Sequence, residues 1–119
     1  MGTRSQVQML HEGIFLYQHW DGYSLPEIVQ EALKKKMRWD DPEYLTRIIF
    51  STMIKDHIED ETGYGISTSQ HGDIEWLVEV DTKKQEITVK EGYNQLDKIW
   101  NGSFDGFIEA DMSEEALTK

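Results

Sequence analysis

Near Gly65, the spacing of apolar residues switches from the period of a helix to the period of a strand, and this switch limits the fold more than any other feature of the sequence. The alternating part predicts a three-stranded antiparallel meander with strands at residues 65–70, 74–80 and 85–91. Its expected inward positions are Ile74, Trp76, Val78 and Val80 on the central strand, with Ile87 and Val89 opposite them.

The helical part contains two helices with separate start signals. The first covers residues 24–38 and begins with a capping box formed by Ser24 and Glu27. The second has Asp41 as its cap and is expected to run to about Asp60. The predicted buried faces are Leu25, Ile28, Val29, Ala32, Leu33 and Met37 on the first helix, and Leu45, Ile48, Ile49, Thr52 and Met53 on the second.

Residues 5–20, which precede the helices, indicate a β-hairpin with Glu12-Gly13 as a two-residue turn. Both faces of this hairpin carry apolar groups, so it is expected to lie inside a larger sheet with cover on each side. One face would hold Val7, Met9, Ile14, Leu16 and Trp20, and the other Leu10, Phe15 and Tyr17.

Residues 92–119 give mixed signals. Apolar residues at 96, 99 and 100 favour a short helical turn, and the pairs Asn101-Gly102 and Asp105-Gly106 favour turns. Residues 113–118 are expected to form a last helix or a frayed end.

The order of these elements predicts an α+β fold. We expect a mainly antiparallel sheet, made of the N-terminal hairpin and the C-terminal three-stranded meander, with two helices packed on one face. A chain of 119 residues is expected to form a single domain over residues 1–119. Its parts are the hairpin and an aromatic corner (1–23), the two helices (24–62), the meander (63–91) and a mixed tail (92–119).

The formal net charge of the chain is -11, and the acidic side chains are concentrated in its last two-thirds. Residues 40–119 hold 19 acidic and 7 basic side chains, whereas residues 1–39 are nearly balanced. Because a nucleic-acid backbone is bound by clustered lysines and arginines, direct nucleic-acid binding is not expected. A basic protein surface is the more natural partner.

Several functional classes lack the residues they need. The chain has no cysteine, which excludes disulfides, a thiolate nucleophile and Cys-based zinc sites, and fits a reducing compartment such as the cytoplasm. No apolar run approaches the length of a signal peptide or a membrane span, so no membrane partner is expected. The common catalytic and nucleotide-binding signatures are also missing. We therefore predict a non-enzymatic protein without a metal or cofactor.

The stretch His19-Trp20-Asp21-Gly22-Tyr23 is the densest group of chemically capable side chains. His19 and Asp21 could pair as a base and its orienting group, or bind a metal together. In the structural interpretation, Asp21-Gly22 is a turn, and Trp20 and Tyr23 plug it on either side. A small enzyme or ligand-binding domain with a pocket at His19, Trp20, Asp21 and Tyr23 is thus the alternative function.

A second candidate site is the expected end of the second helix, where Asp56, Glu59, Asp60 and Glu61 gather. Residues four apart, such as His57 and Glu61, would share a helix face and could hold a divalent cation, although a solvated helix end is the other interpretation. Negative charge is locally unfavourable at a helix C-terminus, which suggests that a partner requires it. Outward-facing glutamates of the meander extend this predicted partner-binding surface: Glu75, Glu79 and Glu86.

Two short motifs carry a resemblance to other proteins. The opening M-G-T-R-S and the corner W-D-G-Y, at residues 20–23, resemble a scattered group of small uncharacterised bacterial, prophage and phage proteins. In that group a proline usually follows the corner, whereas here Ser24 and Leu25 precede Pro26 and lengthen the link into the helix. The resemblance covers about the first 25 residues. It implies a mobile-element context, in which small acidic proteins often bind and disable host machinery, including CRISPR and restriction nucleases.

The sequence and the resemblance together predict a small acidic binding protein. It would inhibit a host nucleic-acid-handling or defence protein by blocking a basic surface, in the manner of an anti-CRISPR protein or a DNA mimic. Self-association as a homodimer is a third interpretation.

Overall fold

The structure is a computed structural model that describes residues 3–118. Met1, Gly2 and Lys119 lie outside the described residues, so the motif M-G-T-R-S is described from Thr3 onward. The elements are β1 (Ser5–Met9), β2 (Ile14–Gln18), the 3-10 helix η1 (Gly22–Ser24), α1 (Leu25–Lys34), α2 (Pro42–Ile54), β3 (Tyr64–Ser67), β4 (Trp76–Asp81), β5 (Glu86–Glu91), β6 (Asp97–Ser103), α3 (Phe104–Glu109) and α4 (Glu114–Leu117).

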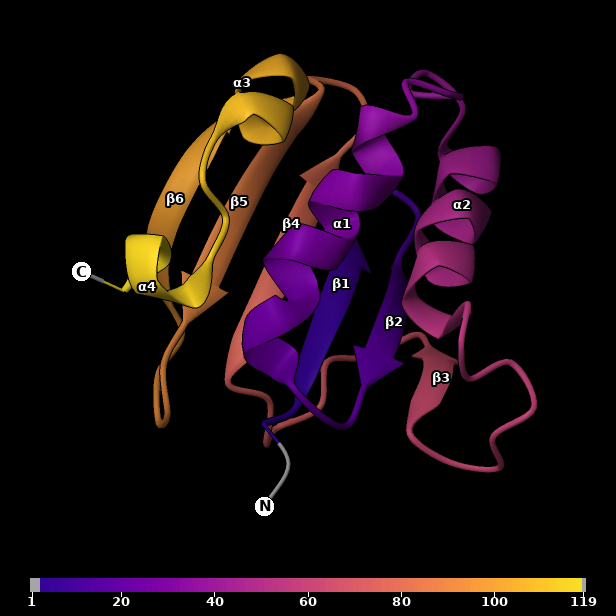
Figure 1. Cartoon of the computed structure of the whole chain (residues 1–119), viewed down its shortest axis with the longest axis vertical. Coiled ribbons are helices and arrows are strands. Elements are labelled where there is room, and N and C mark those ends of the chain that lie inside the picture. The colour runs from indigo at the N-terminus through magenta and orange to yellow at the C-terminus, as the bar shows by residue number, and fades with distance from the viewer. Residues whose placement is uncertain (1–2, 119) are drawn as a thin grey trace.

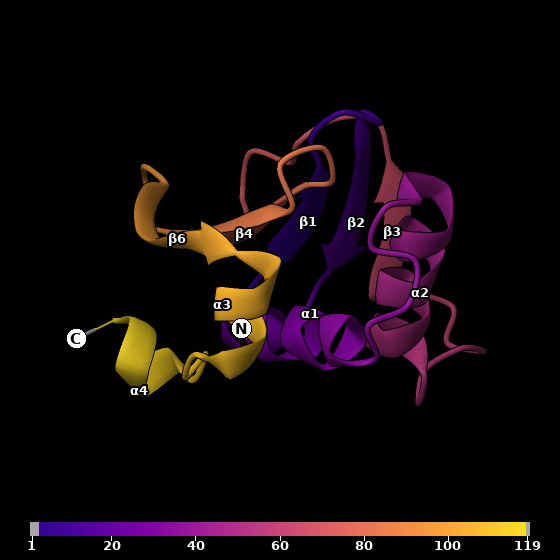
Figure 2. The same cartoon turned by 90° about the horizontal axis from the view of Figure 1, so that it is seen from above.

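Six strands form one sheet in the order β3-β2-β1-β4-β5-β6 (Figure 1). The pair β1 and β4 is parallel, and the other neighbouring pairs are antiparallel. Seen from above, α1, α2, α3 and α4 all lie on one side of the sheet (Figure 2). The predicted α+β class, with a mainly antiparallel sheet and the two main helices on one face, is confirmed.

The N-terminal hairpin is confirmed, but its turn is longer than predicted. Met9 pairs with Ile14, so residues 10–13 form the loop instead of Glu12-Gly13 alone. A shift of two residues keeps the side chains within β1 and β2 on their predicted faces, because side chains alternate along a strand. Leu10 and Trp20, which were also assigned to the two faces, lie outside these strands and are 38% and 45% exposed. Val7, Met9 and Leu16 are accordingly fully buried under the helices.

Both predicted helices form, and the buried face of α2 consists of the five expected residues. Their ends differ from the prediction. The first helix stops at Lys34, and the backbone then turns through positive φ angles at Lys36 and Arg38. The expected capping box is wrong, because the Ser24 hydroxyl donates a hydrogen bond to the Asp21 carbonyl oxygen at 2.6 Å instead of capping α1. The second helix ends at Ile54, six residues before Asp60.

A three-stranded meander is present, but one of its strands was predicted wrongly. The pairing of Val78 with Val89 and of Val80 with Ile87 is confirmed. The strand predicted at residues 65–70 is β3, which pairs with β2 at the far edge of the sheet, and the meander is completed by β6. Alternation shows that a segment is extended without saying which strand it joins, and here β1 and β2 lie between β3 and β4.

The tail is part of the core. The helical turn predicted near residues 96–100 and the two predicted turns are wrong, because these residues form β6 and α3, whereas the last helix is confirmed as α4. Gln30 on α1 ties this region down by donating hydrogen bonds to the carbonyl oxygens of Phe107 and Ala110 at 2.9 and 2.7 Å. The buried apolar residues of the tail are Phe104, Phe107, Ile108, Met112 and Leu117.

Candidate functional site

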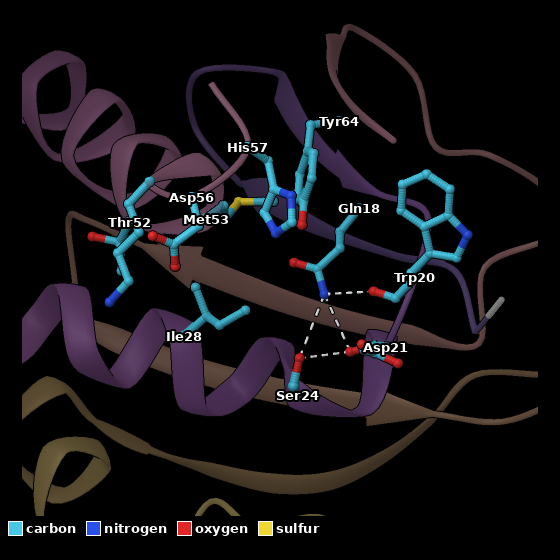
Figure 3. A pocket seen from close by; sticks show the side chains of 11 residues that line it. Gln18, Trp20, Asp21, Ser24, Ile28, Thr52, Met53, Asp56, His57 and Tyr64 are labelled. Atoms are coloured by element: carbon cyan, nitrogen blue, oxygen red, sulfur yellow. Dashed lines mark hydrogen bonds between the residues drawn. The ribbon is translucent and has the colours of Figure 1, made fainter. Parts of the chain in front are cut away.

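A pocket of about 390 Å³ opens where the aromatic corner meets the end of α2 and the start of β3 (Figure 3). The two stretches that sequence analysis singled out, residues 19–23 and 56–61, both contribute to it. The lining residues are Gln18, Trp20, Asp21, Ser24, Ile28, Thr52, Met53, Lys55, Asp56, His57 and Tyr64.

The corner side of the pocket is built around the side chain of Gln18, which is 2% exposed at the end of β2. Its amide nitrogen donates hydrogen bonds to the carbonyl oxygens of Trp20 at 2.8 Å and Asp21 at 3.1 Å. These bonds hold the chain where Asp21 takes a left-handed backbone conformation, with φ of 53°. Gly22 follows so closely against the Thr3 carbonyl oxygen that a Cβ atom would lie 2.6 Å from it. The corner is therefore a rigid turn, as its structural interpretation proposed.

The other amide atom of Gln18 is unsatisfied. Its carbonyl oxygen, Oε1, is buried and has no hydrogen-bond partner. In Figure 3 this oxygen points away from the corner, toward the side of the pocket that holds Met53, Asp56 and His57. A buried acceptor without a donor is costly, so the floor of the pocket offers an unused hydrogen bond.

Opposite the corner, the chain leaves α2 and forms a turn-rich segment, residues 55–62, which we call the acidic loop. His57 stacks on the ring of Tyr64 with centroids 5.2 Å apart, and its Nδ1 lies 2.8 Å from an Asp60 carboxylate oxygen. The Lys55 ammonium lies 2.7 Å from the Glu31 carboxylate on α1. Because α2 ends at Ile54, the predicted sharing of a helix face by His57 and Glu61 is wrong. Among residues 3–118, no three histidine or carboxylate side chains are placed to hold a metal ion.

The pocket is negatively charged. Burial raises the pKa of the Tyr64 hydroxyl, and the nearby carboxylates of Asp60 and Asp21 raise it further. The charge of Asp21 also raises the pKa of Tyr23. Three carboxylates of the acidic loop make no hydrogen bond or ion pair within the described part of the chain: Asp56, Glu59 and Glu61.

Two of the four residues predicted for an alternative pocket lie outside its lining. Arg4 Nε donates a hydrogen bond to His19 Nδ1 at 3.3 Å, and the Tyr17 hydroxyl lies 2.9 Å from the same nitrogen. The predicted base and orienting pair of His19 and Asp21 does not form, because the Asp21 carboxylate instead accepts a hydrogen bond from the Tyr23 hydroxyl at 3.3 Å. Trp20 and Asp21 do line the pocket, whereas His19 and Tyr23 do not.

The predicted partner-binding glutamates of the meander lie elsewhere. Because Val78 and Val80 face the helices, Glu79 lies on the opposite face of β4, and Glu86 begins the neighbouring strand β5. The Glu79 side chain is only 17% exposed and forms an ion pair with Lys90 at 3.0 Å. Glu75 precedes β4 and is half-buried. The structure thus separates the seven predicted residues into two sets: Asp56, Glu59, Asp60 and Glu61 on the acidic loop, and Glu75, Glu79 and Glu86 near the helix-free face of the sheet.

Sequence reasoning missed Gln18 and Tyr64, which shape the floor and wall of the pocket. Neither residue stands in a recognisable motif, although a glutamine in the buried end of an otherwise apolar strand is a signal that could have drawn attention to Gln18. Within residues 3–118, no helix has the length and apolar character needed to cross a membrane. No family model, no curated protein and no solved structure matches this chain. The resemblance carried by M-G-T-R-S and W-D-G-Y therefore stays a prediction.

Proposed function

We propose that this chain is a non-enzymatic binding protein that docks on a basic protein surface through its acidic loop. The observation that carries the proposal is the state of that loop: its carboxylates are exposed, and within the described chain Asp56, Glu59 and Glu61 form no ion pair. Carboxylates that are already held in internal ion pairs have little to offer a partner, whereas these are available.

The acidic loop also carries an apolar contact. Ile58 is 74% exposed in the middle of the loop, and Trp20 is 45% exposed at the rim of the adjoining pocket. Protein interfaces combine an apolar and aromatic centre with a polar rim, and aromatic residues are enriched among those that contribute most to binding. A loop that served solubility alone would have no need of an exposed isoleucine among its carboxylates.

The partner class follows from the charge. A surface that binds DNA or RNA presents clustered lysines and arginines, which a set of fixed carboxylates can occupy in place of phosphates. The proposed partner is therefore a nucleic-acid-handling protein of a host cell, such as a CRISPR effector or a restriction nuclease. This proposal places the chain in the cytoplasm and in the mobile-element context that its terminal motif implies.

The experiment compares two charge-matched variants. The loop variant carries Asp56→Asn, Glu59→Gln, Asp60→Asn and Glu61→Gln, and the sheet variant carries Glu75→Gln, Glu79→Gln, Glu86→Gln and Glu91→Gln. Each is titrated into complexes of fluorescent DNA with purified CRISPR effectors and restriction nucleases, and DNA release is followed by anisotropy. Circular dichroism establishes that both variants are folded.

We expect the wild-type protein to displace DNA from one member of this panel, and less effectively as salt is added. The loop variant should lose at least about tenfold in potency, because four charge contacts of about 0.5 kcal/mol each are removed. The sheet variant should stay within about threefold of the wild type. Displacement that is unchanged in the loop variant, or no displacement from any panel member, would overturn the proposal.

A further inference from the structure

The unpaired oxygen of Gln18 shows what kind of group the pocket lacks. Gln18 is locked in place by its own amide nitrogen, which is committed to the corner carbonyls of Trp20 and Asp21. Its Oε1 therefore cannot rotate toward another donor without breaking those bonds. The pocket needs a hydrogen-bond donor from outside, placed at its floor.

The walls around this oxygen favour a cation. Asp56 lies on one side of the pocket and Asp21 on the other, and neither carboxylate is paired with a basic side chain. The lysine in the lining, Lys55, is already engaged by Glu31. The stacked rings of His57 and Tyr64 complete the wall near the oxygen (Figure 3). A flat, positively charged donor would meet an acceptor, two carboxylates and an aromatic surface.

We propose that this pocket receives the guanidinium group of an arginine side chain from the basic partner. This inference rests on the proposed function and names the contact at its centre. A guanidinium presents five N–H donors in a plane, so once it displaces the atoms that cover Gln18 Oε1 it can donate to that oxygen and to a carboxylate at the same time while lying against the Tyr64 ring. A lysine ammonium is a compact and strongly hydrated point charge, and it matches such spread acceptors less well.

The size of the pocket agrees with a side chain as its occupant. A volume of about 390 Å³ lies near the lower end of the range found for small-molecule sites. It holds one long side chain and leaves the acidic loop free to contact the surface around it. Ile58, in the same loop, would then pack beside the arginine that enters the pocket.

The test uses small probes, so it needs no identified partner. N-acetyl-arginine amide is titrated into the full chain, and the NMR signals of the Gln18 side-chain amide and the Tyr64 ring are followed. N-acetyl-citrulline amide has the same shape without the charge, and N-acetyl-lysine amide has the charge without the plane. We expect the arginine probe to bind with a dissociation constant on the order of 1 mM, and the other two at least about fivefold more weakly.

Three variants localise the binding. Gln18→Met removes the unpaired oxygen and should weaken the arginine probe about tenfold. Because this change also removes the bonds to the corner, Asp56→Asn serves as a second variant on an exposed residue whose carboxylate forms no hydrogen bond or ion pair in the described chain, and it should weaken the probe about threefold. Glu109→Gln, an equal change of charge on the exposed side of α3, is the control and should have no effect.

The outcomes separate this inference from the proposed function. Equal binding of the arginine and citrulline probes, or arginine binding that survives both Gln18→Met and Asp56→Asn, overturns the guanidinium pocket even if the acidic loop displaces DNA. Free L-arginine that binds more than about tenfold tighter than the blocked probe also overturns it, because the site would then be built for a free amino acid. Arginine binding that follows the variants as expected supports the inference, whatever the result of the DNA displacement experiment.

Discussion

Gln18 and Gln30 are both buried glutamines whose amide nitrogen donates hydrogen bonds to two backbone carbonyls, yet they belong to regions with different roles. Gln30 acts across the core, from α1 to the carbonyl oxygens of Phe107 and Ala110 around the end of α3. Gln18 acts locally, on carbonyls two and three residues ahead in the chain.

The oxygen atoms of the two amides differ as well. Gln18 Oε1 is buried, has no hydrogen-bond partner and points toward the pocket. The side chain of Gln30 has no such buried and unpaired oxygen. The hydrogen bonds of Gln30 between α1 and α3 therefore leave no buried oxygen of that side chain unsatisfied, whereas the corner at residues 18–24 holds one unsatisfied acceptor, which we propose as a binding contact. In Gln18 the amide nitrogen stabilises the corner, and the unpaired oxygen is the atom that we propose for binding.

The largest expected effect concerns the joint between α1 and α3. Phe107→Ala removes a fully buried ring from beneath α3 and should lower the free energy of unfolding by about 3–5 kcal/mol, as measured by urea denaturation. Glu109→Gln, an exposed change on the same helix, should stay within about 0.5 kcal/mol of the wild type. If Phe107→Ala changed the free energy of unfolding as little as Glu109→Gln does, the tail would not be part of the core, and Gln30 would not hold a structural joint.

The two glutamines themselves give the next prediction. Gln30→Leu leaves the carbonyl oxygens of Phe107 and Ala110 without their donor and should cost about 2 kcal/mol. Gln18→Leu removes three hydrogen bonds, one of them a long contact of 3.5 Å to the Ser24 hydroxyl, but it eliminates the unpaired buried oxygen at the same time, so its cost should be nearer about 1 kcal/mol. Both values come from urea denaturation. A larger cost at position 18 than at position 30 would show that the corner, too, is purely structural.

The sequence predicted the fold well where the pattern is local. The alternation along β4 and β5 predicted which of their side chains face the core, and the short connection between the two strands predicted that they pair. The spacing along α2 predicted all five of its buried residues, because helical and strand periods depend on near neighbours. The place of β3 beside β2 depends on contacts between distant segments, and no single segment records it. In the tail, β6 and α3 were missed because a local signal misled the prediction. The pairs at 101–102 and 105–106 are typical of turns, but the burial of Phe104 and Phe107 overrides this preference.

The candidate site was only half predictable. Trp20, Asp21 and Asp56 stood out because they lie in dense groups of polar and aromatic residues, and the structure brings these groups to one pocket. Gln18 owes its role to burial, for which the only sequence signal is a glutamine at the end of an otherwise apolar strand. Tyr64 owes its role to stacking on His57, seven residues earlier, and the sequence pattern does not reveal this contact. The glutamates of the meander were predicted from alternation, which gives the face on which a side chain lies but not its ion-pair partner. The structure shows that Glu79 forms an ion pair with Lys90.

A smaller effect is expected where the loop meets the corner. Gly63 directly follows the acidic loop and has a φ angle of +102°. Its carbonyl oxygen accepts a hydrogen bond from the His19 amide at 2.8 Å, and its backbone packs against the ring of Trp20. Gly63→Ala should cost about 1 kcal/mol in urea denaturation, because alanine disfavours this backbone conformation and its methyl group pushes the ring away. The indole N–H signal of Trp20 should shift in the NMR spectrum. Gly72→Ala, where open space surrounds the added carbon, is the control.

The smallest effect measures the negative charge that the pocket leaves unpaired. Burial first, and then the carboxylates of Asp60 and Asp21, hold the pKa of Tyr64 above its usual value of 10.0. Asp60→Asn should therefore lower the pKa of Tyr64 in an NMR titration, whereas Glu86→Gln, on another strand, should leave it unchanged. Because the raised pKa favours the neutral folded form, stability should decline as pH rises from the unfolded value through the folded one, and the decline should be shallower in Asp60→Asn. An unchanged pKa of Tyr64 in Asp60→Asn would mean that the acidic loop does not make the electrostatic potential of the pocket negative. The charge argument for a cation beside Gln18 Oε1 would then fail.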